Sequence, residues 1–394
     1  MNPFDERDVT ELARVDYRHD RRVFGIRRAD RRTHMYIVGQ TGTGKSTLLL
    51  NMIWQDMENG EGVGLIDPHG DLVNQVLACV PPDRQGDVIY FNVPDPMLEI
   101  GFNPLGNVPP SERTLVASDL LEVFKKIWLE FWGPRLEHIL RNSLLALLER
   151  PDSSLSDVLR MLTDREFRRE VTLYLPNRTV REFWLREYEE YPARFRTEAI
   201  APIQNKIGAF LVNPLLYRIL TVTGPANINL RQVMDDRKIF LVNLSKGKIG
   251  EDTASLLGAF LVGQLGRMAL RRADTPERKR HDFYLYLDEF QGVSTPSLAG
   301  MLSELRKYRL NMVLAHQFTS QLDPLVREAI LGNVGTKIAF RVGVTDALLL
   351  EKVYQPDFGC GDLINLANHH VYLRLMVDGE ISKPFSAVTL TRMS

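Results

Sequence analysis

Short apolar runs and longer helical stretches alternate at the start of this chain. Residues 35–38 form an apolar run that ends abruptly in glycines, and a helical stretch follows from Lys45. A strand, a helix and a strand are indicated next by the segments 62–66, 71–80 and 88–93. This alternation is typical of a parallel α/β sheet.

The periodicity becomes helical after Pro104 and stays so over a long segment. One apolar stripe, with spacings of three and four residues, consists of Leu136, Ile139, Leu140, Ser143, Leu144 and Leu147. Alternation then returns, with strands expected at 238–244, 283–287, 311–315 and 336–342 and helices at 252–272, from Pro296 and at 322–331. We therefore predict an α/β fold whose central, mostly parallel sheet is flanked by helices. The sheet belongs to a discontinuous domain, 33–104 and 236–394, with an all-α domain, 105–235, inserted in it and an Arg-rich lead, 1–32, before it.

The length and composition of the chain limit the number of structural units and the classes of function that we expect. The chain has 394 residues, more than the roughly 250–300 at which one hydrophobic core stops growing, so two structural units are expected. Its 49 basic and 50 acidic residues nearly balance, which excludes a globally basic DNA coat but leaves local basic patches open. Cys79 and Cys360 provide neither a disulfide framework nor a cysteine-rich zinc site, so a reducing compartment is expected.

The apolar segments are too interrupted to predict a membrane span. The strongest candidate, residues 256–270, contains glycines, a glutamine and an arginine, and no stretch reaches about 18 uninterrupted apolar residues. Residues 1–22 alternate acids with arginines and lack the apolar core of a signal peptide. We therefore expect no transmembrane segment, no secretion and a cytoplasmic location.

Residues 39–46 carry the strongest chemical signal in the chain. The segment Gly39-Gln-Thr-Gly-Thr-Gly-Lys45-Ser46 follows an apolar strand, opens a helix and satisfies the phosphate-binding pattern G-x-x-x-x-G-K-S. Its glycines let backbone N–H groups converge on phosphate oxygens, Lys45 can bridge the terminal phosphates, and Ser46 is placed to hold magnesium. The predicted cofactors are ATP and Mg²⁺. The predicted cofactor-binding residues are Gly39, Thr41, Gly42, Thr43, Gly44, Lys45, Ser46 and Thr47.

The phosphate-binding loop alone would also fit a small-molecule kinase or a GTPase switch. A pair of acids later in the chain favours an ATPase over these two classes. The apolar strand at 283–287 ends in Asp288-Glu289. This placement predicts Asp288 as the acid on the metal side and Glu289 as the base that orients and deprotonates water. An acidic strand end that is merely solvated is the alternative.

A third strand end adds an amide. The strand at 311–315 is followed by His316-Gln317, and an amide at this position can contact both the γ-phosphate and the attacking water. Gln317 is therefore predicted as a sensor of hydrolysis, with a simple polar cap as the alternative. His316 is expected to be structural.

Two arginines are candidates for a group that one subunit supplies to the next. Thr295-Pro296 predicts the start of a helix, and Arg306 falls about 90° from its inward face, which consists of Leu298, Met301, Leu302 and Leu305. An arginine supplied across a subunit boundary raises phosphoryl-transfer rates by roughly 10³–10⁵. Arg341 is the second candidate, and each arginine also fits a surface position.

Asp67-Pro-His69-Gly-Asp71 follows a strand at the expected carboxyl edge of the sheet. Contact with nucleotide, magnesium or a neighbouring subunit is compatible with that place. A metal site of its own is disfavoured because no second histidine lies at ligand spacing, and a turn is the favoured interpretation.

Taken in order, these motifs resemble those of the HerA/FtsK superfamily of hexameric DNA-pumping ATPases. The resemblance covers roughly residues 33–390 and rests on the segments 39–46, 65–71, 132–137, 285–291, 314–317 and 333–338. Within the superfamily the sequence is most similar to conjugative coupling proteins and related type IV secretion ATPases of the TraD/TraG type.

The resemblance implies a RecA-like P-loop domain with an all-α insertion, a homo-hexameric ring, and DNA that moves through a central pore without sequence specificity. By motif it assigns Lys45 to catalysis, Ser46 and Asp288 to the metal, Glu289 to the base, Gln317 to the sensor and Arg306 to the arginine that completes a neighbour's site. It also implies a membrane-embedded or secretion-system partner, so a place peripheral to the inner membrane is the alternative to a freely cytoplasmic one.

The resemblance leaves two points open. About thirty residues precede the first expected strand, too few for the transmembrane helices of coupling proteins or the β-barrel of HerA proteins, so we expect an excised ATPase portion or a soluble relative. Two other functions stay open: a secretion ATPase that energises transport of proteins or pilus subunits, and an assembly scaffold that ATP closes without hydrolysis. Glu289 argues against the scaffold, because a pure binding switch needs no water-activating base.

Overall fold

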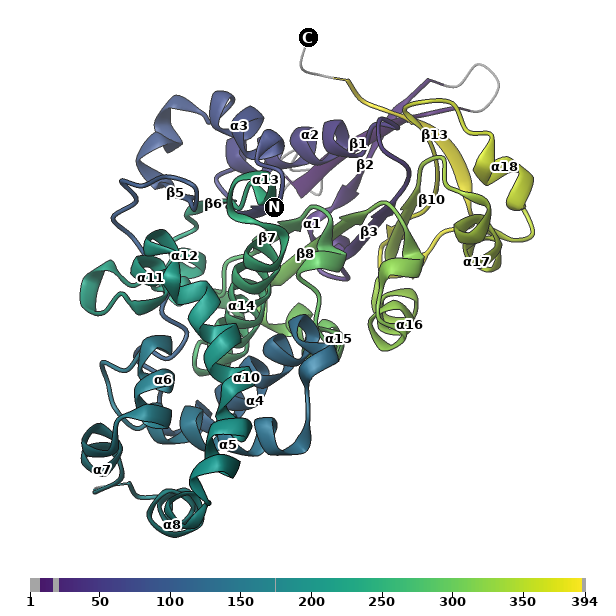
Figure 1. Cartoon of the computed structure of the whole chain (residues 1–394). Helices are drawn as coiled ribbons and strands as arrows, with labels where there is room; N and C mark the ends of the chain where they lie inside the picture. Colours follow the sequence, from purple (N-terminus) through teal and green to yellow (C-terminus); the bar gives the residue numbers. More distant parts are fainter. Residues whose placement is uncertain (1–7, 17–20, 174, 392–394) are drawn as a thin grey trace. The chain divides into compact units, whose positions relative to one another are not determined.

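The structure, a computed structural model, describes residues 8–16, 21–173 and 175–391 (Figure 1). The chain folds into two compact units, and each unit is assembled from separate stretches of sequence. The first unit comprises the residues up to Asn92 together with 230–249 and 265–394, and the second comprises 93–229 and 250–264.

One mixed sheet forms the centre of the first unit. Among the described residues it has eleven strands, in the spatial order β2 (Val23–Arg27), β1 (Val9–Val15), β13 (Phe385–Thr389), β10 (His370–Arg374), β9 (Thr336–Ala339), β3 (Met35–Val38), β8 (Leu310–His316), β7 (Phe283–Leu287), β4 (Gly62–Asp67), β6 (Ile239–Asn243) and β5 (Val88–Asn92). The strands from β9 to β5 are parallel to one another. The strands from β10 to β2 extend the sheet in antiparallel fashion. A short hairpin of β11 (Met376–Val377) and β12 (Glu380–Ile381) lies outside this sheet.

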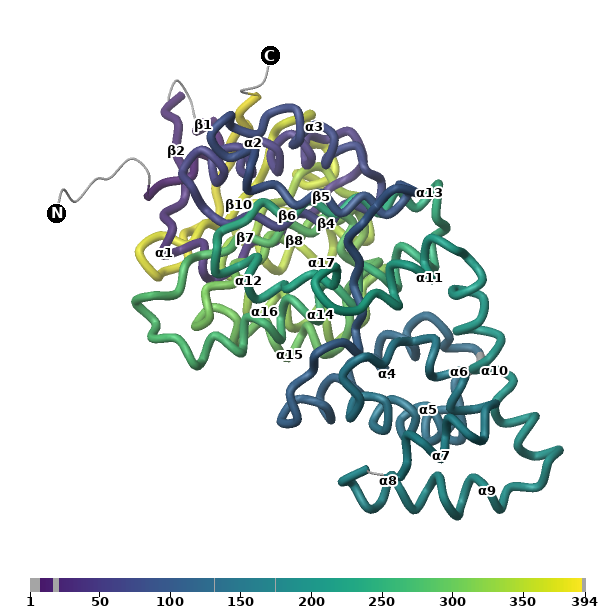
Figure 2. Tube along the Cα trace, turned by 90° about the vertical axis from the view of Figure 1, so that its left-hand side faces the viewer, coloured from purple at the N-terminus to yellow at the C-terminus, as the bar shows by residue number. Residues whose placement is uncertain are grey.

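The parallel strands at the centre of the sheet are mostly apolar because helices cover both faces of the sheet. Every residue of β3, β4, β6, β7 and β8 is buried, as expected for strands enclosed on two sides. Figure 2 shows α2 (Lys45–Glu58) and α3 (Asp71–Ala78) on one face and α15 (Pro296–Leu305) and α16 (Pro324–Asn333) on the other. The remaining helices of this unit are α1 (Arg28–Arg31), α12 (Leu230–Asp235), α13 (Lys246–Ile249), α17 (Val344–Tyr354) and α18 (Cys360–Ile364).

The second unit is built from helices. They are α4 (Arg113–Ile127), α5 (Pro134–Leu147), α6 (Leu155–Thr163), α7 (Arg165–Leu173), α8 (Arg178–Glu182), α9 (Tyr188–Glu190), α10 (Ala193–Val212) and α11 (Pro214–Thr221), together with the first part of α14 (Glu251–Leu270). All six residues of the stripe predicted on α5 are buried, so that expectation is confirmed.

The motif at 132–137 has a structural explanation within this unit. Gly133 and Pro134 provide an extended N-cap and the first helical residue of α5. The indole of Trp132 donates to the carboxylate of Glu137 at 2.8 Å, and Arg141 donates to the other oxygen of the same carboxylate at 3.0 Å. The spacing of the motif therefore places side chains that hydrogen-bond to one another at the first turn of the helix.

Helix α14 with the turn that follows it, Glu251–Asp274, is the one candidate membrane span found among the described residues. It is long and apolar enough by composition, but 78% of its most apolar window is buried inside the protein. The core helix of a folded domain has the same properties, which agrees with the buried helix expected from the sequence.

The observed units differ from the predicted domain bounds at several points. The second unit begins at Val93 rather than at 105 and also takes in residues 250–264. The lead at 1–32 was given no strands in the sequence analysis, yet β1 and β2 lie within it, and β1 pairs with β13 near the other end of the chain. The predicted bounds of 33–104, 105–235 and 236–394 stay a prediction, since compactness alone does not show that a unit is a separate domain.

Candidate active site

The predicted site segments meet at one edge of the sheet because their strands are parallel neighbours. Strand β8 is followed by Gln317, which lies beside the loop that follows β3, since Val38 pairs with His316. Strand β7 is followed by Asp288, which lies beside Asp67, the last residue of β4. The chain thus carries an amide, two acids and the glycine-rich loop to a common carboxyl edge.

The glycine-rich loop is a compact turn that runs from β3 into α2. Gly44 is the N-cap of α2 and has φ 119°, a conformation that side-chain-bearing residues rarely adopt. Lys45 is 6% exposed, and its ammonium group donates to the carbonyl oxygens of Gly39 at 2.6 Å and Gln40 at 3.1 Å. Burial lowers the pKa of Lys45, and the nearby charges of Glu289 and Asp288 oppose that shift. The lysine is therefore held against its own loop with the two acids in electrostatic reach.

The start of α2 offers a row of unused hydrogen-bond donors. The backbone N–H groups from Gly42 to Thr47 donate to no acceptor among the described residues, and Leu48 is the first to bond back into the helix. No side chain caps this end of α2. Unpaired N–H groups at the positive end of a fourteen-residue helix fit the oxygens of a phosphate chain.

Two carboxylates lie opposite this helix end. Asp288 is half-buried, and burial, followed by the charges of Asp67 and Glu289, raises its pKa to about 7. Glu289 is 9% exposed and has a left-handed backbone, φ 46° and ψ 47°, which is rare for a residue other than glycine. This turn directs the side chains of Asp288 and Glu289 into one pocket. The negative charge of the two neighbouring carboxylates favours the binding of a cation there.

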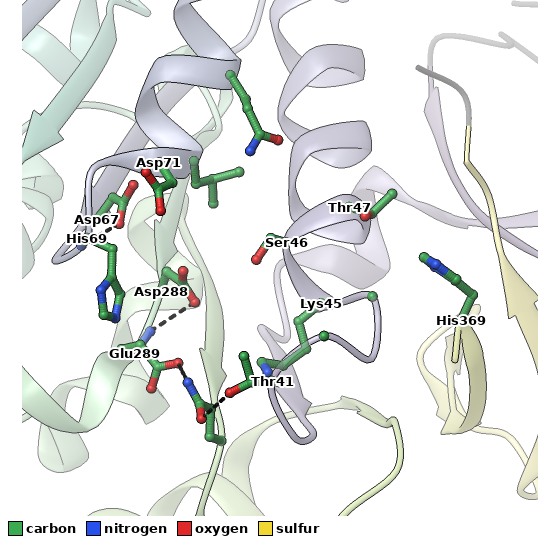
Figure 3. A pocket seen from close by; sticks show the side chains of 15 residues that line it. Thr41, Lys45, Ser46, Thr47, Asp67, His69, Asp71, Asp288, Glu289 and His369 are labelled. Atoms are coloured by element: carbon green, nitrogen blue, oxygen red, sulfur yellow. Dashed lines mark hydrogen bonds between the residues drawn. The ribbon is translucent and has the colours of Figure 1, made fainter. Parts of the chain in front are cut away.

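A chain of polar side chains links the loop to Glu289. The hydroxyl of Thr41 donates to Gln317 Oε1 at 2.7 Å, and Gln317 Nε2 donates to Glu289 Oε1. Gln291 Nε2 donates to the other carboxylate oxygen, Glu289 Oε2, at 2.8 Å. Figure 3 shows the contacts that lead from Thr41 across to Glu289; Gln291 is not drawn there. Gln317 therefore touches both the phosphate loop and the predicted base.

The turn at 67–71 is held by one of its own acids. Asp67 is 1% exposed, and its carboxylate accepts the backbone N–H of His69 at 2.8 Å and that of Val73 at 3.1 Å. Gly70 has φ 90°, and a Cβ there would lie 2.5 Å from Asn243 Oδ1. These contacts agree with the favoured interpretation of a turn, while His69 and Asp71 remain exposed on the pocket side.

These groups enclose a pocket of about 660 Å³ within the first unit. Its walls are Thr41, Gly42, Gly44, Lys45, Ser46, Thr47, Asp67, His69, Asp71, Leu72, Gln75, Asp288, Glu289, Gln317 and His369. In Figure 3 the acids and His69 stand on one side, with Lys45, Ser46 and Thr47 across from them. Gly39 and Thr43, also predicted as cofactor-binding, are not among the walls; the Thr43 hydroxyl donates to the carbonyl of Gln40 at 2.7 Å inside the loop.

The side-chain oxygens that line the pocket suit a magnesium ion that is bound together with phosphate. The described residues contain no group of three or more His, Cys, Asp or Glu side chains arranged to hold a metal ion. Mg²⁺ keeps several waters and is usually held by one or two protein oxygens plus substrate phosphates. The hydroxyl of Ser46 and the carboxylate of Asp288 provide such a pair across the pocket.

His316 has a structural place, as expected. It is fully buried, its Nε2 lies 2.6 Å from the hydroxyl of Tyr36, and its ring packs against Phe290. Burial lowers its pKa to about 3, so it is neutral at physiological pH.

The structure does not bring Arg306 to this pocket. Arg306 is exposed at the end of α15, where its charge acts on His34 just before β3, at the amino edge of the sheet. Arg341 lies near the pocket but is already bound within its own chain. Its guanidinium donates to Gln40 Oε1, to the carbonyl of Leu366 and to Asn368 Oδ1 at 3.4, 3.1 and 3.1 Å.

Comparison with known protein families identifies the family of this chain. A family model described as the central domain of the helicase HerA matches residues 29–264, more than half of the chain. The chain belongs to the HerA central-domain family. The predicted membership of the HerA/FtsK superfamily is thereby confirmed. A second model, described as the TraM recognition site of TraD and TraG, matches residues 282–353. No curated protein sequence matches the chain.

Solved structures with the same fold include two kinds of protein. The plasmid coupling protein TrwB, in complex with a non-hydrolysable GTP analogue, is 17% identical with a TM-score of 0.66 over 94% of this chain and 88% of TrwB. TrwB in complex with ADP and Mg²⁺ aligns over the same shares, with 17% identity and a TM-score of 0.65. VirB4 of Thermoanaerobacter pseudethanolicus is 15% identical with a TM-score of 0.65 over 97% of this chain and 96% of that one. The predicted fold class is confirmed by these likenesses.

The residues around the pocket that were not predicted from the sequence include Gln291 and His369. Gln291 lies within the matched segment 285–291, but no role was given to it. His369 follows no motif, and it reaches the pocket because the loop before β10 folds back onto the glycine-rich loop.

Proposed function

We propose that this chain is an ATP- and Mg²⁺-dependent motor that moves DNA through a ring of six identical subunits. The observation that carries the proposal is the placement of Lys45 and the start of α2 across one pocket from Asp288, Glu289 and Gln317. The membership of the HerA helicase family supports the motor activity, and the complexes of TrwB with ADP and Mg²⁺ support the cofactors.

The glycine-rich loop and α2 would bind the phosphates of ATP. The unpaired N–H groups from Gly42 to Thr47 supply donors along the chain of phosphates, and Thr41, Ser46 and Thr47 line the same wall. Lys45 now bonds to loop carbonyls, and it would exchange these neutral acceptors for phosphate oxygens, which are stronger partners for a cation. Mg²⁺ held by Ser46 and Asp288 would neutralise the charge that develops on the transferred phosphoryl group.

Glu289 would orient and deprotonate the attacking water, since its carboxylate lies beside Asp288 at the far end of the pocket. Gln317 and Gln291 hold that carboxylate in the present arrangement. Because Gln317 also accepts from Thr41 in the phosphate loop, phosphate binding at the loop bears directly on the position of Glu289. Gln317 therefore suits the role of a sensor.

Arg306 would act in the neighbouring subunit. Within its own chain it lies at the opposite edge of the sheet, and its guanidinium makes no hydrogen bond or ion pair with the residues that the structure describes. The three acceptors already bound by Arg341 favour Arg306 over Arg341 for this part. An arginine supplied by a neighbour makes ring assembly a requirement for turnover.

The cargo is proposed to be DNA, bound through its backbone phosphates without base specificity. We further propose a cytoplasmic location with attachment to the inner membrane through a membrane-embedded or secretion-system partner. This partner is supported by the match of residues 282–353 and by the fold shared with coupling proteins and VirB4.

ATP hydrolysis with and without DNA tests the proposal. The rate should rise on addition of single- or double-stranded DNA of any sequence, and the stimulation should weaken steeply between about 50 and 200 mM salt. Hydrolysis without stimulation by either form of DNA would indicate a protein or pilus-subunit secretion ATPase. ATP-dependent ring closure without turnover would indicate a scaffold.

A further inference from the structure

His369 lines the pocket on the side away from the acids, and the proposed mechanism does not use it. Figure 3 places it beyond Thr47, on the far side of the phosphate loop from Glu289. It belongs to the loop before β10, more than three hundred positions along the chain from the glycine-rich loop. A role for this residue rests on the proposed binding of ATP.

The loop that carries His369 is fastened to the phosphate loop. The backbone N–H of His369 donates to the carbonyl of Thr43 at 2.8 Å, and its own carbonyl accepts the N–H of Thr389 at 2.8 Å. Arg341 bridges the two loops, because its guanidinium donates to both Gln40 and Asn368. These bonds hold His369 in a left-handed backbone conformation, φ 66°, that few non-glycine residues adopt.

The imidazole ring is placed with one nitrogen unused. The Nδ1 atom is buried and has no hydrogen-bond partner among the described residues. A Cβ on Gly44 would lie 2.8 Å from that atom, so only glycine at this position lets the ring stand so close to the phosphate loop.

The position of the ring along the pocket identifies what it would meet. In the proposed mode of ATP binding, the terminal phosphate lies near Glu289 and Gln317, and the start of α2 binds the phosphates that follow. The nucleoside is then the part of ATP that extends past Thr47 toward His369. We propose that His369 binds the nucleoside of the nucleotide, with its ring stacked on the base. A ring that contacts the face of a base reads none of its edges, so adenine and guanine should be accepted alike.

The test compares ligands that have or lack a nucleoside. Binding of ATP, GTP and inorganic tripolyphosphate is measured for the full chain and for His369→Ala. We expect His369→Ala to bind both nucleotides about tenfold more weakly, in line with the loss of one stacked ring, and to bind tripolyphosphate as the wild type does. In ATP hydrolysis the loss should fall on KM rather than on kcat.

Two further variants make the outcomes separable. His281→Ala, at an exposed histidine before β7, removes the same kind of side chain away from the pocket and should bind all three ligands normally. Lys45→Ala should weaken all three. Equal losses for tripolyphosphate and ATP in His369→Ala, or no loss for either, would overturn the role of His369. Failure of the wild-type chain to bind ATP at all would instead contradict the proposed function.

Discussion

Arg306 provides a sharp test of whether neighbouring subunits complete each other's sites. In one subunit it lies at the amino edge of the sheet, whereas the pocket lies at the carboxyl edge. Strand β8 joins the two edges with seven residues, and at roughly 3.3 Å per residue the separation is about 20 Å. Arg306 therefore cannot reach its own pocket. We expect subunits with Arg306→Ala and subunits with Lys45→Ala to be inactive alone and active when mixed.

The size of the recovery follows from counting interfaces. In a random one-to-one mixture, half of the pockets belong to Arg306→Ala subunits, which keep Lys45. Half of these pockets face a Lys45→Ala neighbour, which keeps Arg306, so roughly a quarter of the sites are complete. Loss of the arginine alone costs roughly 10³–10⁵ in rate, so a quarter of the wild-type rate stands far above the background. Phosphate release should peak at the equal ratio and fall with the product of the two fractions.

Matched mixtures serve as controls. Lys45→Ala mixed with Glu289→Gln removes groups from the same pocket, so no interface is complete and no recovery is expected. Arg341→Ala in place of Arg306→Ala should not be rescued either, because Arg341 is bound to Gln40, Leu366 and Asn368 of its own chain. If rings shown to contain both Lys45→Ala and Arg306→Ala subunits stay inactive at every ratio, Arg306 does not act across the boundary.

Three further predictions concern the metal, the loop and the turn. Because the pKa of Asp288 is raised to about 7, Mg²⁺ must displace a proton from this carboxyl group below that pH. The apparent affinity for Mg²⁺, measured by titration in the presence of ATP, should rise about tenfold from pH 6 to pH 8 and then level off. An affinity that does not change with pH would exclude Asp288 as a ligand. Gly44→Ala should abolish ATP binding in calorimetry, because φ 119° is strained for alanine and its Cβ would lie 2.8 Å from His369 Nδ1; normal affinity would contradict this geometry. Asp67→Ala leaves two backbone N–H groups of the turn at 67–71 unpaired, so it should lower the free energy of unfolding, measured in urea, by about 2–4 kcal/mol. An unchanged midpoint of urea unfolding would show that the turn does not depend on this carboxylate.

The parallel core of the fold was predictable because its strands are short, mostly apolar and bounded by glycine or polar residues. Strands β3 and β7 have the predicted bounds, and β4, β5, β6 and β8 differ from them by one residue at one or both ends. Strand β9 ends at Ala339, three residues before the predicted end at 342. The antiparallel extension was not predicted. β1 and β2 lie in a segment rich in arginine, and their partner β13 is near the other end of the chain, so no local pattern indicates the pairing.

The candidate site was predictable to the extent that it depends on strand ends. Lys45, Asp288, Glu289 and Gln317 each follow a buried parallel strand or open the helix after it, so the topology alone brings them to one pocket. The sequence could not show that Gln317 bonds to Glu289, since the rotamers of both depend on the packed loop. It also could not place His369, because that contact comes from backbone hydrogen bonds between loops far apart in the sequence.

The central claim is that ATP lies on the glycine-rich loop with Glu289 as its catalytic base. The most direct measurement is ATP binding and single-turnover hydrolysis by Glu289→Gln, which keeps the size of the side chain and its contact with Gln317 while removing the charge. We predict wild-type affinity for ATP and a turnover rate at least about 10²-fold lower. Hydrolysis at the wild-type rate by this variant would exclude Glu289 as the catalytic base.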